Sequence, residues 1–206
     1  MKILVLSDIH SSFSNLKNIL DAASYDTVFI AGDITQFKRE DVFQADAIIS
    51  KFTDECYAVH GNCDYEDILE YDLDAIRFIH GKSVKVDNFT LHGLGGSGIT
   101  PFGTPSEYTE EEMRSFIQSF QFGDRNILLS HCPPKGILDT TRSGINAGCR
   151  VIRENIGLFD VAFCGHIHEC HGIINSVITA VNPGPVMWGR FAIFNAESME
   201  AELNRI

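Results

Sequence analysis

Five short apolar runs, each closed by polar residues or glycine, limit how this chain can fold. They occupy residues 2–6, 27–31, 56–60, 126–130 and 159–164. Each run is long enough for one buried strand and too short for a helix. Amphipathic segments separate the first three runs, so strand and helix alternate. This alternation predicts parallel pairing with right-handed crossovers, and therefore an α/β fold.

The segments between the runs carry helix signals. Ser14 is expected to cap a first helix, and a second is predicted over residues 41–52. Further along, Thr109 and Glu112 form a capping-box pattern ahead of an apolar stripe with helical spacing. A last helix is expected over residues 147–155. These helices would cover the outer faces of the predicted sheet.

The remaining segments favour hairpins and one long loop. Antiparallel hairpins are predicted within residues 82–94, 172–181 and 188–203. The glycine-rich stretch 95–105 is expected to be an irregular loop at the rim of a substrate site, because long loops in compact domains are often functional. No repeat, linker or sharp change in charge divides the chain, so residues 1–206 are predicted to form a single domain.

Composition narrows the class of protein. A hydrophobic content of 44% with 21% charged residues is typical of a globular domain. No run has the length of a membrane span. The six cysteines form no C-x-x-C pair, which favours a reduced, cytoplasmic protein. The net charge of −12 and the lack of basic clusters disfavour binding to long nucleic acids.

Polar residues of metal-ligand type follow each apolar run. Residues i and i+2 of an extended segment point the same way, so paired ligands after one strand can serve one site. Functional groups in parallel α/β sheets gather at the carboxyl ends of strands. Each residue alone could simply cap a helix or occupy a turn, but together they favour a metal centre. The candidates are Asp8, His10, Asp33, Asn62, His131, His166 and His168.

The same residues form a series of motifs that resembles the calcineurin-like metallophosphoesterases. The resemblance covers residues 1 to about 185 and implies a four-layer α/β/β/α sandwich with the site at one end. The motifs, in chain order, are Asp8-Ile9-His10, Gly32-Asp33, Gly61-Asn62-Cys63-Asp64, Ser130-His131 and Gly165-His166-Ile167-His168.

The resemblance also implies two divalent metal ions bridged by Asp33. One ion would take Asp8, His10 and His168, and the other would take Asn62, His131 and His166. The mixed nitrogen and oxygen ligands suit Mn²⁺, which is preferred here, and also Fe, Zn²⁺ or Ni²⁺. Two divalent ions and the negative charges of two aspartates would give the pocket a net charge of about +2. That charge would attract an anionic substrate to an acidic protein.

The implied reaction is the hydrolysis of a small phosphoester by a metal-bridging hydroxide. Asn62, Cys63, Asp64 and His131 are the predicted catalytic residues. Cys63 departs from the family pattern, in which most members carry His. It could be a weak acid, a thiolate near the cations or a small filler. Some phosphodiesterase-type members of the family also read G-N-C-D, so small, nucleotide-like phosphodiesters are the expected substrates.

Three other functions remain open at this point. A phosphomonoesterase would use the same site. A protein-binding scaffold with this fold would be expected to have damaged ligand positions, and none is damaged here. A nuclease acting on long chains is disfavoured by the charge. The hairpin-rich C-terminal half could also offer an edge for a homo-oligomer.

Overall fold

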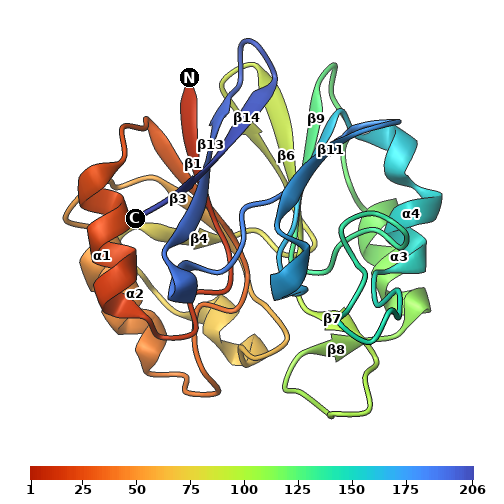
Figure 1. The fold of residues 1–206 in the computed structure, drawn as a ribbon, viewed down its shortest axis with the longest axis horizontal. Coiled ribbons are helices and arrows are strands. Elements are labelled where there is room, and N and C mark those ends of the chain that lie inside the picture. Colours follow the sequence, from red (N-terminus) through yellow and green to blue (C-terminus); the bar gives the residue numbers. More distant parts are fainter.

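The computed structural model describes residues 1–206 and contains two six-stranded sheets packed face to face. Helices α1 (Phe13–Ala22) and α2 (Asp41–Ile49) cover the outer face of one sheet. Helices α3 (Glu110–Gln118) and α4 (Arg150–Glu154) cover the outer face of the other. The expected four-layer α/β/β/α sandwich is therefore confirmed, and its layers can be followed from left to right in Figure 1.

The first sheet is built mainly from the N-terminal half of the chain. Its first four strands pair in parallel, and the last two strands of the chain add antiparallel at one edge. The sheet order is β14-β13-β1-β2-β3-β4. The strands are β1 (Lys2–Leu6), β2 (Thr27–Ala31), β3 (Cys56–Val59), β4 (Ile76–Phe78), β13 (Arg190–Asn195) and β14 (Glu200–Arg205).

The second sheet has four parallel strands flanked by an antiparallel strand on each edge, in the order β11-β12-β10-β9-β6-β5. A separate two-stranded ribbon lies in the predicted loop region. The strands are β5 (Ser83–Val86), β6 (Phe89–Leu94), β9 (Asn126–Ser130), β10 (Val161–Phe163), β11 (Gly172–Asn175) and β12 (Thr179–Asn182), with β7 (Ser97–Gly98) and β8 (Glu107–Tyr108) in the ribbon.

The sequence patterns located the helices better than their ends. Thr109 forms the expected capping box with Glu112 at the start of α3. The prediction that Ser14 caps the first helix is wrong, because α1 begins at Phe13 after Ser12. The helices predicted over residues 41–52 and 147–155 are shorter in the structure, since α2 ends at Ile49 and α4 covers only Arg150–Glu154.

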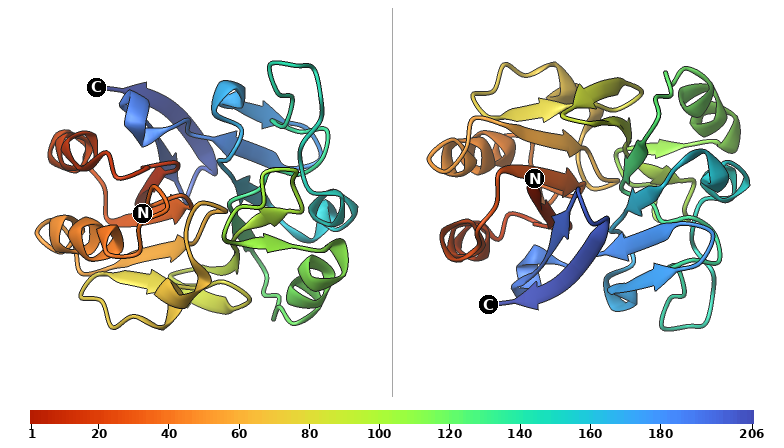
Figure 2. Two further views of the ribbon diagram at one scale, coloured as in Figure 1. Left: turned by 90° about the horizontal axis from the view of Figure 1, so that it is seen from below. Right: turned by 90° about the horizontal axis from the view of Figure 1, so that it is seen from above.

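Short 3₁₀ turns complete the connections. They are η1 (Glu66–Glu70), η2 (Ile156–Leu158), η3 (His168–Cys170) and η4 (Val186–Trp188). The views along the sandwich in Figure 2 show α1 and α2 on one side and α3 and α4 on the opposite side, with the sheets between them. None of the helices combines the length and apolar character that a bilayer span requires.

The interior between the sheets is aromatic. Phe29 on β2 is fully buried and meets Tyr57, Phe89 and Phe163 edge-on, with ring centroids 5.9–6.3 Å apart. Two of these partners belong to the opposite sheet, so Phe29 joins the two layers. Edge-to-face packing fixes relative ring positions more tightly than aliphatic contact. This contact therefore helps to set how the strand ends of the two sheets face each other.

Replacing Phe29 with Ala should destabilise the protein by about 3–5 kcal/mol, because the change leaves a cavity between the sheets. The matched control is Phe102→Ala, because Phe102 is 82% exposed and its loss should change stability by less than about 0.5 kcal/mol. Urea unfolding of both variants measures the difference. A loss below about 1 kcal/mol for Phe29→Ala would show that the sheets do not depend on this contact.

Candidate metal centre

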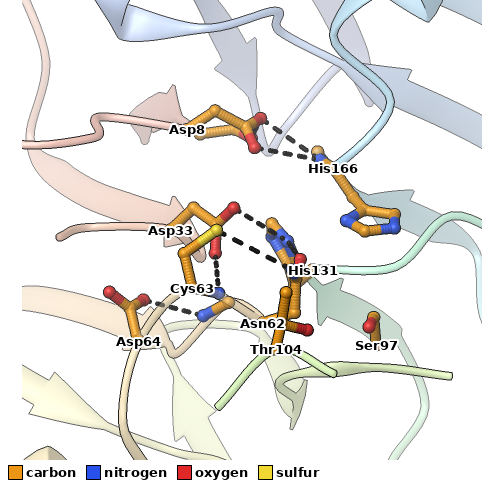
Figure 3. A network of polar contacts seen from close by, with 12 residues as sticks. Asp8, Asp33, Asn62, Cys63, Asp64, Ser97, Thr104, His131 and His166 are labelled. Atoms are coloured by element: carbon orange, nitrogen blue, oxygen red, sulfur yellow. Dashed lines mark hydrogen bonds and ion pairs between the residues drawn. The ribbon is translucent and has the colours of Figure 1, made fainter. Parts of the chain in front are cut away.

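The predicted ligands from separate strands meet around the carboxylate of Asp33. Its Oδ2 atom lies 3.6 Å from Nε2 of His10 and 3.5 Å from Nε2 of His131. These residues follow β1, β2 and β9, so both sheets contribute to the same point (Figure 3). Asp33 is 2% exposed and therefore sits at the end of the core rather than on the surface. Its position between the two rings is the one that a bridging ligand requires.

The backbone at these strand ends is held in an uncommon conformation. Asp8, His10, Asp33 and His166 all have positive φ angles, between 45° and 68°. Residues with a Cβ adopt this region at a cost of about 1 kcal/mol or more each, and such strain clusters at functional sites. Two hydrogen bonds hold the first two loops together: the N–H of Asp8 donates to the carbonyl of Gly32, and that of His10 donates to the carbonyl of Asp33.

Asp8, His10 and His168 form one tight group, whose ligand atoms all lie within 4.8 Å of one another. Nε2 of His168 is 3.2 Å from Nε2 of His10 and 3.3 Å from Oδ1 of Asp8. Asp8 also accepts hydrogen bonds from the Ser7 hydroxyl and from the backbone N–H of His166. The side chain of His168 is 27% exposed, so this group opens to solvent on one side.

His131 and Asn62 form the core of the second group. Nδ1 of His131 donates to the carbonyl of Ala31 at 2.8 Å, which directs Nε2 toward the cluster. Nε2 lies 3.0 Å from Oδ1 of Asn62. Nδ2 of Asn62 is directed at the Cys63 sulfur. Nε2 of His131 and Oδ1 of Asn62 therefore point toward one place, where they could share a cation.

His166 is placed differently from the other predicted ligands. Its backbone N–H donates to Asp8, and its ring centroid lies 5.0 Å from that of His131. It belongs to none of the three tight ligand groups in the structure. Figure 3 shows its ring on the side of His131 away from Asp64. The structure thus places His166 at the edge of the cluster, beside the other ligands of the ion site to which the family resemblance assigns it.

Three glycines allow the strand ends to approach this closely. A Cβ atom on Gly32 would lie 2.5 Å from Nδ1 of His131, and one on Gly61 would collide with the Asp33 carboxylate. A Cβ on Gly165 would collide with Ser7 and lie 2.6 Å from Oδ2 of Asp8. Each glycine therefore occupies a place where only a bare backbone fits.

The protonation states suit divalent cations. Burial lowers the pKa of His10, and it lowers that of His166 to about 4, so both rings are neutral at physiological pH. Burial alone would raise the pKa of Asp8, but contacts with His168 and His131 outweigh it and lower the pKa. Burial alone would lower the pKa of His168, but the hydrogen bond to Asp8 outweighs it and raises the pKa, so a cation bound there would displace a proton from this ring. Imidazoles, carboxylates and an amide oxygen are the ligand set that transition-metal ions take. The residues present therefore fit a pair of such ions.

Cys63 and Asp64 have separate positions in the next turn. The Cys63 sulfur lies within 4.8 Å of the ligand atoms of His10 and Asp33. The backbone N–H of Cys63 donates to Oδ1 of Asp33. Burial and the Asp33 charge raise the pKa of the Cys63 thiol. Asp64 instead accepts N–H groups from Ile34, Thr35 and Gly61. Asp64 therefore holds the loops that follow β2 and β3 together, and its predicted catalytic part stays a prediction.

The sequence did not reveal two features next to the cluster. The indole of Trp188 on η4 meets the His168 ring edge-to-face, with ring centroids 5.5 Å apart. A groove of about 760 Å³ is lined by Asn62, His166 and residues of the segments 97–102 and 141–150. The predicted rim loop 95–105 supplies one wall of this groove. Neither feature has a local sequence signal, because both arise from segments far apart in the chain.

The chain is similar to a known archaeal sequence and to solved structures. It is 36% identical over 199 residues to the uncharacterised protein MJ1162 of Methanocaldococcus jannaschii, with 90% of this chain and 88% of that protein covered. The structure resembles TT1561 of Thermus thermophilus, with a TM-score of 0.75, 15% identity and coverage of 99% and 98%. It also resembles a structure described as a novel archaeal phosphodiesterase, with a TM-score of 0.55, 18% identity and full coverage of both chains.

The two solved structures are too distant in sequence to show more than a shared fold. A family model is more informative, because the model described as calcineurin-like phosphoesterase matches residues 1–170. That range contains all the residues gathered around Asp33. The chain therefore belongs to the calcineurin-like phosphoesterase family.

Proposed function

We propose that this chain hydrolyses small, nucleotide-like phosphodiesters with the help of two divalent cations, preferably Mn²⁺. The observation that carries the proposal is the Asp33 carboxylate, which lies 3.6 Å from His10 and 3.5 Å from His131. A buried carboxylate between two imidazoles from different sheets has the position of a ligand shared by two ions. Membership of the phosphoesterase family supports the same interpretation.

The two cation sites divide the surrounding residues. Asp8, His10 and His168 would hold one ion and Asn62, His131 and His166 the other, with Asp33 shared between them. When bound, the ions supply Lewis-acid chemistry that activates water and offsets the charge on the phosphoryl oxygens. They would also leave the pocket at about +2 within a chain of net charge −12, and so draw an anion to this point.

Residues of the chain itself favour diesters over alkyl monoesters. Cys63 lies beside Asp33 and His10, where it can approach the leaving group. A thiol at the place where most family members carry His offers no imidazole acid to the leaving group, which suits substrates whose leaving group departs without much help. The solved archaeal phosphodiesterase with the same fold is consistent with this preference.

The proposed setting is cytoplasmic and the proposed partner is a small phosphoester. All six cysteines are free in the structure, as expected in a reducing compartment. The net charge of −12 would repel a long polyanion outside the metal pocket.

Isothermal titration of chelator-treated protein with Mn²⁺ should give two ions per chain. Asp33→Asn should weaken both sites at least tenfold, because it removes the shared charge, whereas His131→Ala should leave one site near its original affinity. Asp124→Asn on the exposed surface is the control and should bind as the unmodified protein does. Two unchanged sites in Asp33→Asn would rule out the shared-ligand arrangement.

Replacing Cys63 with His should raise the ratio of monoester to diester hydrolysis by about tenfold or more, because imidazole is a better general acid near neutral pH. Cys63→Ser keeps the size of the side chain without a suitable pKa and should leave the ratio near that of the unmodified protein. Initial rates on β-glycerophosphate, an alkyl monoester, and on bis-p-nitrophenyl phosphate measure the ratio. Equal ratios in all three proteins would remove Cys63 from substrate selection.

A further inference from the structure

We propose that the groove beside the metal centre binds a large, uncharged, apolar ester group, so that the substrate joins a single phosphate to such a group. This inference rests on the proposed function and goes beyond it by naming the chemical class of the group next to the phosphate. Asn62 and His166, two of the proposed ligands, belong to the groove lining, so a phosphate held by them would have its ester group beside the groove.

The groove exposes large apolar side chains from both walls. Ile99 and Phe102 on one wall are 68% and 82% exposed, and Ile145 on the other is 63% exposed. Met113 and Tyr108 form part of the lining between them. Single exposed hydrophobic residues are common, but several around one concave site indicate a binding surface for an apolar group.

The charges on the groove cancel each other. Glu110 and Arg150 are the charged residues of its lining, and they pair with 2.6 Å between Oε2 and Nη2. Arg150 also faces Glu154, with 3.5 Å between Nε and Oε1. The residues that line the groove offer no unpaired cation to a second phosphate, and the net charge of −12 would oppose it. The groove therefore favours an uncharged group over a further phosphate.

Hydrogen bonds shape both walls before any ligand arrives. On the first wall, Glu107 accepts from the N–H and hydroxyl groups of both Thr100 and Thr104. On the second, Asp139 accepts from the N–H groups of Gly136 and Gly148. Walls that are already ordered lose little conformational entropy on binding, so apolar burial can contribute directly to affinity.

Gly98 provides a way to block the groove without disturbing the fold. A Cβ atom on Gly98 would meet no atom within 4 Å, and the residue lines the groove. Gly157 in η2 is equally open but lies outside the groove lining. Gly98→Leu should therefore narrow the groove, and Gly157→Leu serves as its matched control.

The first experiment compares methyl p-nitrophenyl phosphate with phenyl p-nitrophenyl phosphate on the Mn²⁺-loaded protein. The leaving group is the same, so changes in the phenyl-to-methyl ratio of kcat/KM between variants report on the second ester group.

The double variant Ile99→Gln with Phe102→Gln should lower the ratio about tenfold. Gly98→Leu should lower it similarly, whereas Gly157→Leu and Val177→Gln should not change it. Val177 is 68% exposed, as Ile99 is, and lies outside the groove.

The second experiment measures binding of diphenyl phosphate and dimethyl phosphate by calorimetry, with and without Mn²⁺. The unmodified protein should prefer diphenyl phosphate, and the double variant should lose the preference. Equal binding of the two, or a preference that survives in the double variant, overturns the groove assignment while the proposed activity stands. Absence of turnover with a preserved binding preference overturns the proposed activity and supports the groove.

Sedimentation of the same proteins separates a ligand groove from an interface. The unmodified protein should remain in the same association state as the double variant. A dimer that the double variant converts to a monomer would show that the apolar side chains bind a second copy of the chain, and would overturn the inference.

Discussion

The structure depends on keeping two carboxylates, Asp8 and Asp33, buried side by side at the end of its core. Like charges in a dry site repel strongly, and burial penalises each of them. The chain offsets part of this cost with directed donors: the hydroxyl of Ser7 and the N–H of His166 reach Asp8, and the N–H of Cys63 reaches Asp33. Oδ2 of Asp33 faces the imidazole nitrogens of His10 and His131 instead, and cations bound there would offset the charge that is left.

Such a cluster requires several strand ends to lie close together in fixed relative positions. His166 is 158 residues from Asp8 in the chain, yet its N–H donates to that carboxylate. The aromatic contacts of Phe29 align the two sheets, and the glycines at the strand ends remove the bulk that would separate them. Strain in the ligand backbone is tolerated because packing from both sheets holds it. The core therefore acts as the rigid support that a precise site needs.

Sequence patterns predicted those features of the site that depend on neighbouring residues in the chain. The buried runs before Asp8, Asp33 and His131 are strands, and the ligand residues follow them as expected. Strand β4 escaped notice because its three residues carry no pattern of their own and form a strand only by pairing with β3. The part that Asp64 plays was equally hidden, since its partners Ile34 and Thr35 come from another loop.

In the proposed function, selectivity and catalysis would depend on different physical effects at adjacent places. The metal centre would attract any phosphate by charge, and charge alone cannot distinguish one ester from another. The neighbouring groove contributes shape and apolar contact without net charge, because Arg150 is already paired with Glu110. An acidic surface excludes polyanions that approach from elsewhere. A phosphodiester with an uncharged apolar ester group satisfies all three conditions, whereas a polyphosphate satisfies only the first. The groove therefore restricts what the cations would otherwise accept.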